Sequence, residues 1–315
     1  MATTKNPALS NNQKYDRCYI LTVGNYSTGR GLRLASNETP DPLQLTFSVD
    51  KNSDHKHNRG NSASIEVYNL SADQQLLLDD DFLELELYVG YNNGEGAKLL
   101  VKGNVTDRST IKRGTDSITQ LIVGEGYTNL TTSRISQIVA PGQTVADVFN
   151  TIVDNMPGVA RGSIVGTNLN SPIIHGWRLS GTPKEELDKL ARAYNLEYHI
   201  TNDTLTVTDL NQPNSKSTVN VPIISQDTGM IEQPFRITDK ARISKKDKRR
   251  RPGVQVKWLL DAAVLPSSLV RIEHGTYSGF YRVSSVRFSG EFRGGRWDCE
   301  LQCHIMQDED LVVLN

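Results

Sequence analysis

The sequence has few of the features that mark a secreted, disulfide-stabilised or membrane-spanning protein. Its only cysteines are Cys18, Cys299 and Cys303, and an odd, sparse set does not make a disulfide framework. No stretch approaches the ~18 consecutive apolar residues that span a bilayer. The polar first residues also lack the apolar core of a signal peptide. We therefore expect synthesis in the reducing interior of a cell and no membrane partner.

An excess of charge of either sign is also lacking. The 315 residues carry a formal net charge of −1, which gives no overall attraction to nucleic acid or to an anionic membrane. Charged residues make up 23% of the chain, which is not the composition of a disordered polymer of low hydrophobicity. A chain of this length has room for about two domains.

The familiar catalytic motifs are missing as well. The sequence has no G-x-S-x-G elbow, H-E-x-x-H pair, P-loop or dinucleotide-binding glycine motif in a strand–helix context. The sequence does not exclude a pair of carboxylates for glycoside cleavage, because the fold brings such residues together, but no pair stands out. We predict a protein that is not an enzyme, with no catalytic residues and no cofactor.

Alternating apolar residues dominate the first part of the chain and predict strands. The clearest set has five members with period two: Leu83, Leu85, Leu87, Val89 and Tyr91. Shorter stretches around 45–49, 65–67, 100–106 and 118–123 follow the same pattern. After a flexible arm over residues 1–14, we expect a β-barrel domain of about six strands over residues 15–125.

Two capped helices distinguish the middle of the chain, residues 126–215. Thr144 can cap a helix with Asp147 in its first turn, where a carboxylate is favoured. The apolar positions of this helix form one stripe: Val145, Val148, Phe149, Ile152 and Val153. Pro157 and Gly158 follow its end.

The second helix has a stronger start signal. Thr182, Pro183 and Glu185 together make an N-cap, a proline at the first helical position and a capping box. Asn195 can adopt the left-handed exit, and a hairpin with a turn near 202–203 follows. The middle segment is therefore predicted to be a smaller α+β insert.

The last part, residues 216–306, is predicted to be a second β-barrel domain, followed by a tail over residues 307–315. A slip in the apolar phase between Val283 and Val286 predicts a β-bulge near residues 284–285. Residues 100–123 and 281–303 share a design of strand, polar Arg-Gly turn and long return strand, which suggests an internal duplication. The fold class is thus α+β and mainly β.

Two groups of residues suit metal ligation by type. His55 and His57 have a suitable spacing, but no third ligand lies near them, so a solvated loop is favoured. Cys299 and Cys303 share the strand face of apolar neighbours, where cysteine packs as a small apolar side chain, while His304 faces the other way. We predict no metal site.

The one concentrated charge feature lies within residues 240–252. Its cations form a candidate loop for contact with a partner: Lys245, Lys246, Lys248, Arg249, Arg250 and Arg251. Such a run is most often a hydrated loop. Contact with an acidic partner surface and binding of nucleic-acid phosphates stay open as alternatives.

The order of these segments resembles a known family. A first barrel containing SIEVYNLS, an insert with SGTPKEELDKLARAYNLEYHITNDTLTVTD, the segment TGMIEQP and a final barrel with GEFRGGRWDCELQC are similar to the baseplate hub proteins of contractile-tailed bacteriophages. That family is related to the late control protein D family and to the hub part of type VI secretion spike proteins. The resemblance covers roughly residues 15–306.

The resemblance implies a structural virion protein of the tail baseplate, made and assembled in the bacterial host cytoplasm. A homotrimer with two barrels per chain would form a pseudo-sixfold ring between the sixfold tail tube and the threefold spike. The implied partners are itself, the spike protein and a tail tube or tube-initiator protein, and further ones are tape-measure and baseplate wedge proteins. The family offers no catalytic residues, and the basic run has no counterpart in its pattern.

Two other functions stay open from the residues alone. One is a tail-associated peptidoglycan hydrolase, against which the lack of a catalytic constellation argues. The other is a nucleic-acid-binding β protein, which only the basic run supports.

Overall fold

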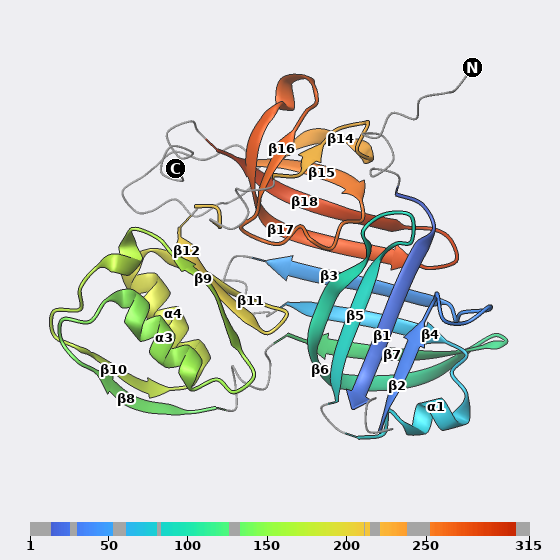
Figure 1. Ribbon diagram of the computed structural model, residues 1–315, viewed down its shortest axis with the longest axis horizontal. Coiled ribbons are helices and arrows are strands. Elements are labelled where there is room, and N and C mark those ends of the chain that lie inside the picture. The colour runs from blue at the N-terminus through green and yellow to red at the C-terminus, as the bar shows by residue number, and fades with distance from the viewer. Residues whose placement is uncertain are drawn as a thin grey trace, which may run out of the picture.

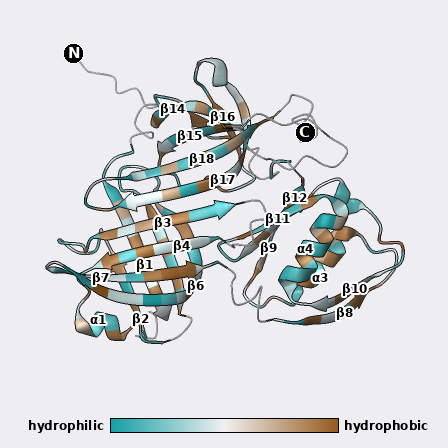
Figure 2. Ribbon diagram, turned by 180° about the vertical axis from the view of Figure 1, so that it is seen from behind, coloured by the Kyte–Doolittle hydropathy of each residue, from teal (hydrophilic) through white to brown (hydrophobic). Residues whose placement is uncertain are grey.

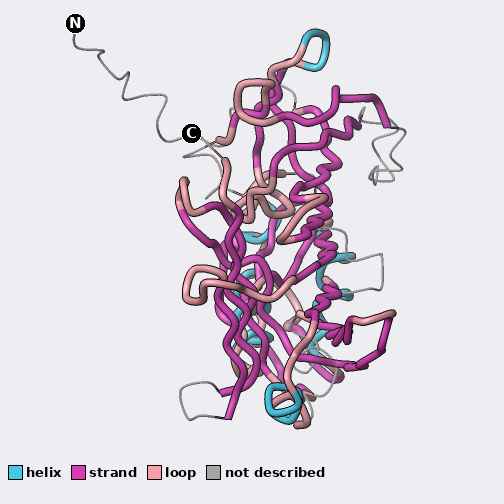
Figure 3. Tube along the Cα trace, turned by 90° about the vertical axis from the view of Figure 1, so that its right-hand side faces the viewer, coloured by secondary structure: helices cyan, strands magenta, loops and turns pink. Residues whose placement is uncertain are grey.

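A computed structural model describes most of the chain. The described residues are 14–25, 30–52, 61–80, 83–125, 133–210, 212–214, 221–237 and 253–306. Strands run through the full height of the molecule and helical segments are short (Figure 3). The predicted class, α+β and mainly β, is confirmed.

One large sheet contains thirteen strands within the described residues. The strands of its N-terminal part are β1 Arg17–Asn25, β2 Arg30–Ala35, β3 Leu45–Asn52, β4 Ser62–Tyr68, β5 Glu84–Tyr91, β6 Gly96–Arg113 and β7 Asp116–Gly124. Those of its C-terminal part are β13 Ile223–Ile224, β14 Met230–Ile237, β15 Gly253–Leu259, β16 Leu269–Ile272, β17 Gly279–Glu291 and β18 Trp297–Ile305. The N-terminal part therefore has seven described strands where about six are predicted.

The path of the sheet is continuous through both parts. Its order is β14-β15-β18-β17-β3-β4-β7-β6-β5-β1-β2, with β16 on β17 and β13 on β16. We call β14-β15-β18-β17 the second unit and β3-β4-β7-β6 the first unit. The two units join where β17 pairs antiparallel with β3, from Ser285 opposite Asn52 to Glu291 opposite Thr46. Within the described residues the pairing forms an open path that extends through both predicted barrels, with no closed ring of strands.

The first unit bends at β6. Residues 96–104 of this strand pair with β5, and residues 104–113 pair with β7. The register shifts between Val105 and Asp107, and such a bulge bends a strand and increases its twist. The bend folds β5, β1 and β2 across the first unit, as Figure 1 shows.

The second unit bends in the same way at β17. Its residues 279–282 pair with β16, and a register shift follows between Val283 and Ser285. The bulge predicted near residues 284–285 is confirmed. Hydrophobic and hydrophilic residues alternate along these strands (Figure 2), and the apolar sides form one core that includes Leu21, Phe47 and Phe288.

The middle of the chain forms a separate body beside the sheet (Figure 1). Its elements are β8 Ile135–Val139, α3 Val145–Asp154, β9 Ala160–Val165, β10 Trp177–Gly181, α4 Pro183–Tyr194, β11 Leu196–Thr201 and β12 Thr204–Asp209. Strands β8 and β10 pair with each other, and β11, β12 and β9 form a three-stranded sheet. We call residues 133–210 the insert body, and its helices pack on a core of their own.

The two predicted helices are confirmed with their caps. Thr144 and Thr182 each close a capping box, with Asp147 and Glu185 respectively. Asn195 ends α4 in the left-handed conformation, with φ 55° and ψ 48°. All five predicted stripe residues of α3 are buried.

A short helix was not predicted. Helix α1, Ala72–Leu76, begins at Ser71 in a capping box that Gln74 completes. The local signal was therefore present, but the helix is only five residues long and buries no side chain, so it has no apolar stripe to reveal it.

Candidate assembly interface

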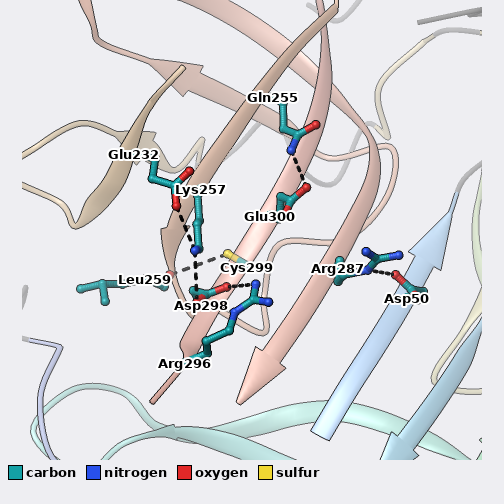
Figure 4. A network of polar contacts seen from close by, with 10 residues as sticks. All are labelled: Asp50, Glu232, Gln255, Lys257, Leu259, Arg287, Arg296, Asp298, Cys299 and Glu300. Atoms are coloured by element: carbon teal, nitrogen blue, oxygen red, sulfur yellow. Dashed lines mark hydrogen bonds and ion pairs between the residues drawn. The ribbon is translucent and has the colours of Figure 1, made fainter. Parts of the chain in front are cut away.

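The side of the sheet away from the apolar core is polar and spans both units. Strand residues alternate between the two sides, so the residues beside the core positions of β15, β18, β17 and β3 share the other side. Charged residues of this side, together with Glu232 of β14 and Arg296 beside β18, form what we call the charged face: Asp50, Glu232, Lys257, Arg287, Arg296, Asp298 and Glu300 (Figure 4).

Opposite charges on the charged face are paired, either across neighbouring strands or, for Arg296 and Asp298, within one segment. Lys257 Nζ lies 3.0 Å from Glu232 Oε1 and 3.9 Å from Asp298 Oδ2. Arg296 Nη2 lies 2.9 Å from the other oxygen of Asp298, and this contact raises the pKa of Arg296. An exposed pair such as Lys257–Glu232 contributes little stability by itself, about 0–1 kcal/mol, whereas Asp298 is only 5% exposed and both of its pairs are partly buried. Their effect is to leave few free charges on this side.

One pair crosses the junction of the two units. Arg287 of β17 donates to Asp50 Oδ1 of β3 at 2.7 Å (Figure 4). The hydrogen bond to Asp50 raises the pKa of Arg287 above its ordinary value. The charged face is therefore continuous from one unit to the next.

The sheet has a free strand edge at the end of each unit. Within the described residues, β14 pairs with β15 alone, and residues 107–113 of β6 pair with β7 alone. A free edge presents unpaired N–H and C=O groups to another chain. The two edges lie at opposite ends of the eight strands that the units contribute.

The outward groups of the β6 edge follow from the contacts of β7. The N–H of Ser117 donates to Asn69 Oδ1, and its C=O accepts from the N–H of Asn69, at the end of β4. Ser117 therefore makes no ladder hydrogen bond to Lys112, its partner on β6. Alternate residues repeat this pattern, and the close Oγ1 contact of Thr110 and Thr119, 3.1 Å, fits a pair without ladder bonds. Thr110 therefore directs its backbone N–H and C=O away from β7.

The β14 edge is less regular. Pro234 lacks a donor, and the register against β15 shifts between Met230 and Glu232 and again between Glu232 and Phe235. Ile231 and Phe235 are exposed along this strand. Proline and bulges weaken indiscriminate pairing of an edge strand.

A shallow pocket of about 500 Å³ lies near the turn of the β17–β18 hairpin. Its charged lining residues already have partners: Arg17 donates to the carbonyl oxygens of Glu291 and Gly295. Arg293 contacts Asp41 and donates to the Pro42 carbonyl oxygen at 2.7 Å. These contacts connect β1 and the β2–β3 loop to the hairpin.

The candidate partner loop cannot be compared with the structure. Lys245, Lys246, Lys248, Arg249, Arg250 and Arg251 lie outside the described residues. So do His55 and His57. The loop would connect the end of β14 to the start of β15, two neighbouring strands at the edge of the second unit.

The cysteines of β18 occupy the predicted place. Cys299 and Cys303 are fully buried in the apolar core, and burial raises the pKa of the Cys299 thiol to about 12. His304 lies on the other side of the strand and is also buried. Among the described residues, no three histidine, cysteine or carboxylate side chains are grouped so that they could hold a metal ion.

Sequence reasoning did not find the charged face or the free edges. The charged positions of β15 and β18 alternate with apolar ones, a pattern that indicates half-buried strands but not what their polar side faces. In the part of the chain that the structure describes, no helix combines the length and apolar character needed to cross a membrane.

The sequence matches no protein-family model and no curated protein. The structure does match solved structures. A tail protein from Neisseria meningitidis MC58 has a TM-score of 0.60 at 13% identity, over 93% of this chain and 97% of that one. The 43 kDa tail protein of prophage MuSo2 from Shewanella oneidensis has a TM-score of 0.60 at 9% identity, over 94% and 98%.

A third match is the E. coli c3393 protein, a component of the type VI secretion system described as similar in structure to the T4 bacteriophage tail proteins gp27 and gp5. Its TM-score is 0.58 at 9% identity, over 86% of this chain and 76% of that one. The chain therefore has a fold found in phage tail proteins and in type VI secretion components.

Proposed function

We propose that this chain is a structural, non-enzymatic protein of a phage tail, the central hub of a contractile-tail baseplate. Three copies form a pseudo-sixfold ring that connects the sixfold tail tube to the threefold spike. The proposed domains are the arm 1–14, the β domains 15–125 and 216–306 around the insert 126–215, and the tail 307–315. The fold shared with phage tail proteins supports this function.

The repeated order of the two units is the observation that carries the proposal. The second unit is β14-β15-β18-β17 and the first is β3-β4-β7-β6. The last strand of each unit, β6 or β17, is long and has a bulge. The part of the strand after the bulge forms the edge of the unit. By this correspondence β17 is equivalent to β6, and β14 is equivalent to β3.

The equivalence predicts how copies join. Inside the chain, the edge of β17 pairs with β3. The equivalent contact between copies joins the free edge of β6 to β14 of the next copy. Such a head-to-tail contact closes into a ring when its rotation permits. Three copies with two units each then supply six similar positions.

The same geometry orients the charged face. The core and the crossing strands β5 and β1 lie on the other side of the units. A closed ring therefore directs the charged face to its channel and this bulk outward. The proposed partners at the two ends of the ring are a tail tube or tube-initiator protein and the spike, and the tape-measure and baseplate wedge proteins are further ones.

Thr110→Pro tests this ring. The substitution removes an outward N–H of the β6 edge and leaves the bonds to β7 in place, so the fold should persist. Loss of the ladder contact should weaken assembly on the order of 100-fold. Native mass spectrometry should show three copies for the parent protein and one copy for the variant.

Ile111→Pro is the matched control, since the N–H of Ile111 points toward β7. That variant should lower the melting temperature of the single chain itself. Interfaces of the ring should belong to the obligate class, on the order of 2,000 Å² or more each. A parent protein that stays monomeric, or that assembles with six copies per ring, contradicts the proposal, as does a Thr110→Pro variant that still forms trimers.

A further inference from the structure

The sheet of the insert body has two unlike sides. Leu196, Tyr198 and Ile200 of β11 pack into the core under the helices. The alternating residues on the opposite side of β11 and β12 are polar. A sheet with one covered face normally leaves such a side in water. Here that side is also buried, and its members are Glu197, His199, Thr201, Thr206 and Thr208.

The large sheet contacts this polar side. Figure 1 shows β11, β12 and β9 between helices α3 and α4 and the strands of the large sheet. We call the contact region the joint. It receives Lys51 of β3, Asn61 and Glu125 beside the ends of β4 and β7, and Arg282 of β17.

A buried lysine holds the tip of the β11–β12 hairpin. Lys51 is 0% exposed, because it continues the alternation that buries Phe47 and Val49 of β3. Its Nζ lies 2.8 Å from Glu125 Oε1 and donates to Asn202 Oδ1 at 3.1 Å. Burial lowers the pKa of Lys51, and Glu125 opposes that effect.

Asn61 connects the same carboxylate to the backbone of β11. Its Nδ2 donates to Glu125 Oε2 and to the Ile200 carbonyl oxygen, each at 2.7 Å, with Thr201 Oγ1 at 3.3 Å. One amide group thus joins the end of the sheet to the hairpin. The signal in the sequence would have been a lysine in the apolar phase of β3 and an asparagine directly before β4.

A second charge pair lies at the other end of β11. The Arg282 guanidinium contacts the Glu197 carboxylate and donates to Ser267 Oγ at 2.9 Å and to the Gln212 carbonyl oxygen at 2.8 Å. His199 lies between the two charge pairs. Burial first, and then Arg282 and Lys51, lower its pKa to about 3, so it is neutral at pH 7.

The apolar cores on the two sides of the joint are separate. The core of the large sheet and that of the insert body share no residue. A buried ion pair contributes little net stability, because desolvation offsets its attraction. Separation would also return the polar side of β11 and β12 to water. Polar contacts between domains of one chain commonly permit relative motion.

We propose that the insert body separates reversibly from the large sheet as a folded unit, opening at the joint. The closed state holds one defined orientation through directional polar contacts. The open state keeps both apolar cores intact and exposes the polar side of β11 and β12 together with the polar groups of the large sheet that meet it. The insert is therefore a hinged module of the subunit.

Thiol labelling of the full chain tests this motion. Thr201→Cys places a thiol in the joint, whereas Val207→Cys places one in the insert core, and both positions are nearly inaccessible in the closed state. Native Cys299 reports opening of the large sheet. We expect the thiol at position 201 to react at least roughly tenfold faster than the other two, because local opening precedes global unfolding.

Two results would overturn the proposal. Equal labelling rates at all three positions would mean that the joint opens only when the whole chain unfolds. Rapid labelling at both 201 and 207 with slow labelling at Cys299 would mean that the insert unfolds. Thr206→Cys, on the same side as Thr201, gives an independent probe that spares the hydrogen bond from Asn61.

A charge variant gives the complementary measurement. Glu197→Gln leaves Arg282 buried without its anion, which should speed labelling at position 201 about tenfold further and leave position 207 unchanged. Asp50→Asn removes the anion of the exposed Arg287 pair and should change neither rate. An unchanged rate at 201 in Glu197→Gln, or a parallel rise at 207 and Cys299, would contradict opening at the joint.

Discussion

The second unit and the insert body join the first unit in different ways. The second unit continues its sheet through the β17–β3 ladder and shares its apolar core. The insert body meets the same sheet through Lys51, Asn61 and Arg282, and its core is separate. A ladder with a common core makes one cooperative body, whereas a polar contact between two cores joins two bodies.

A core substitution in β17 should have the largest effect on stability. Phe288 is fully buried where the two units meet. Phe288→Ala should lower the free energy of unfolding by about 3–5 kcal/mol through lost packing and a cavity. Because the units share a core, calorimetry should show one transition of the large sheet moving to lower temperature. Two separate transitions of the sheet would contradict a shared core of the two units.

The matching substitution in the insert is Leu190→Ala. Leu190 is fully buried in the separate core of the insert body, so its loss should cost about 2–5 kcal/mol. Thr182→Ala, which removes the cap of α4, should cost only about 1 kcal/mol. Hydrogen exchange should locate both losses in the insert body. A larger loss for the cap variant would contradict the buried role of Leu190.

The tip of the β11–β12 hairpin should give the joint a pH dependence. Burial, helped by Glu84, Glu125 and Glu86 against Lys102, raises the pKa of Asp203 to about 6, above the unfolded value of about 3.9. The folded state therefore binds this proton more tightly. Its ionisation destabilises the folded chain above pH 6, and the penalty disappears as pH falls through 6 toward 4.

Asp203→Asn isolates this effect. Asparagine tolerates the left-handed backbone of this position, where φ is 55°. The variant should have a higher melting temperature than the parent at pH 7.5 and the same one near pH 4. A gain of equal size at both pH values would show that Asp203 does not titrate as described.

The smallest effect is expected from the basic run. Neutralising Lys248, Arg249, Arg250 and Arg251 should leave the melting temperature and the trimer unchanged, since charges at a rim contribute little to final affinity. We predict that it faces the rim or outer side of the ring, not the channel. Such charges mainly speed encounter with a partner.

Association with a neighbouring baseplate protein should therefore slow, most visibly at low salt, where charges act over longer distances. Stopped-flow mixing at two salt concentrations measures this rate. An unchanged rate at every salt concentration would leave only a hydrated loop, and a structure with these side chains along the channel would contradict the placement.

Local sequence by itself determined the capped helices α3 and α4, the alternation of the strands and the bulge in β17. Each depends on neighbouring residues: Thr182 with Glu185, or the phase slip between Val283 and Val286. It also indicated that residues 100–123 and 281–303 share a design, which agrees with the bulged hairpins β6–β7 and β17–β18.

Only the tertiary structure decided which strands became neighbours and what covered each polar face. The β17–β3 ladder joins residues more than 200 positions apart, and no local pattern specifies such a pairing. Glu197, His199 and Thr201 have the alternation of a solvent-facing side, yet they are buried at the joint, where Arg282 contacts Glu197 and Asn61 donates to Thr201. Periodicity reports whether a side chain is polar, and burial depends on what the rest of the chain places against it.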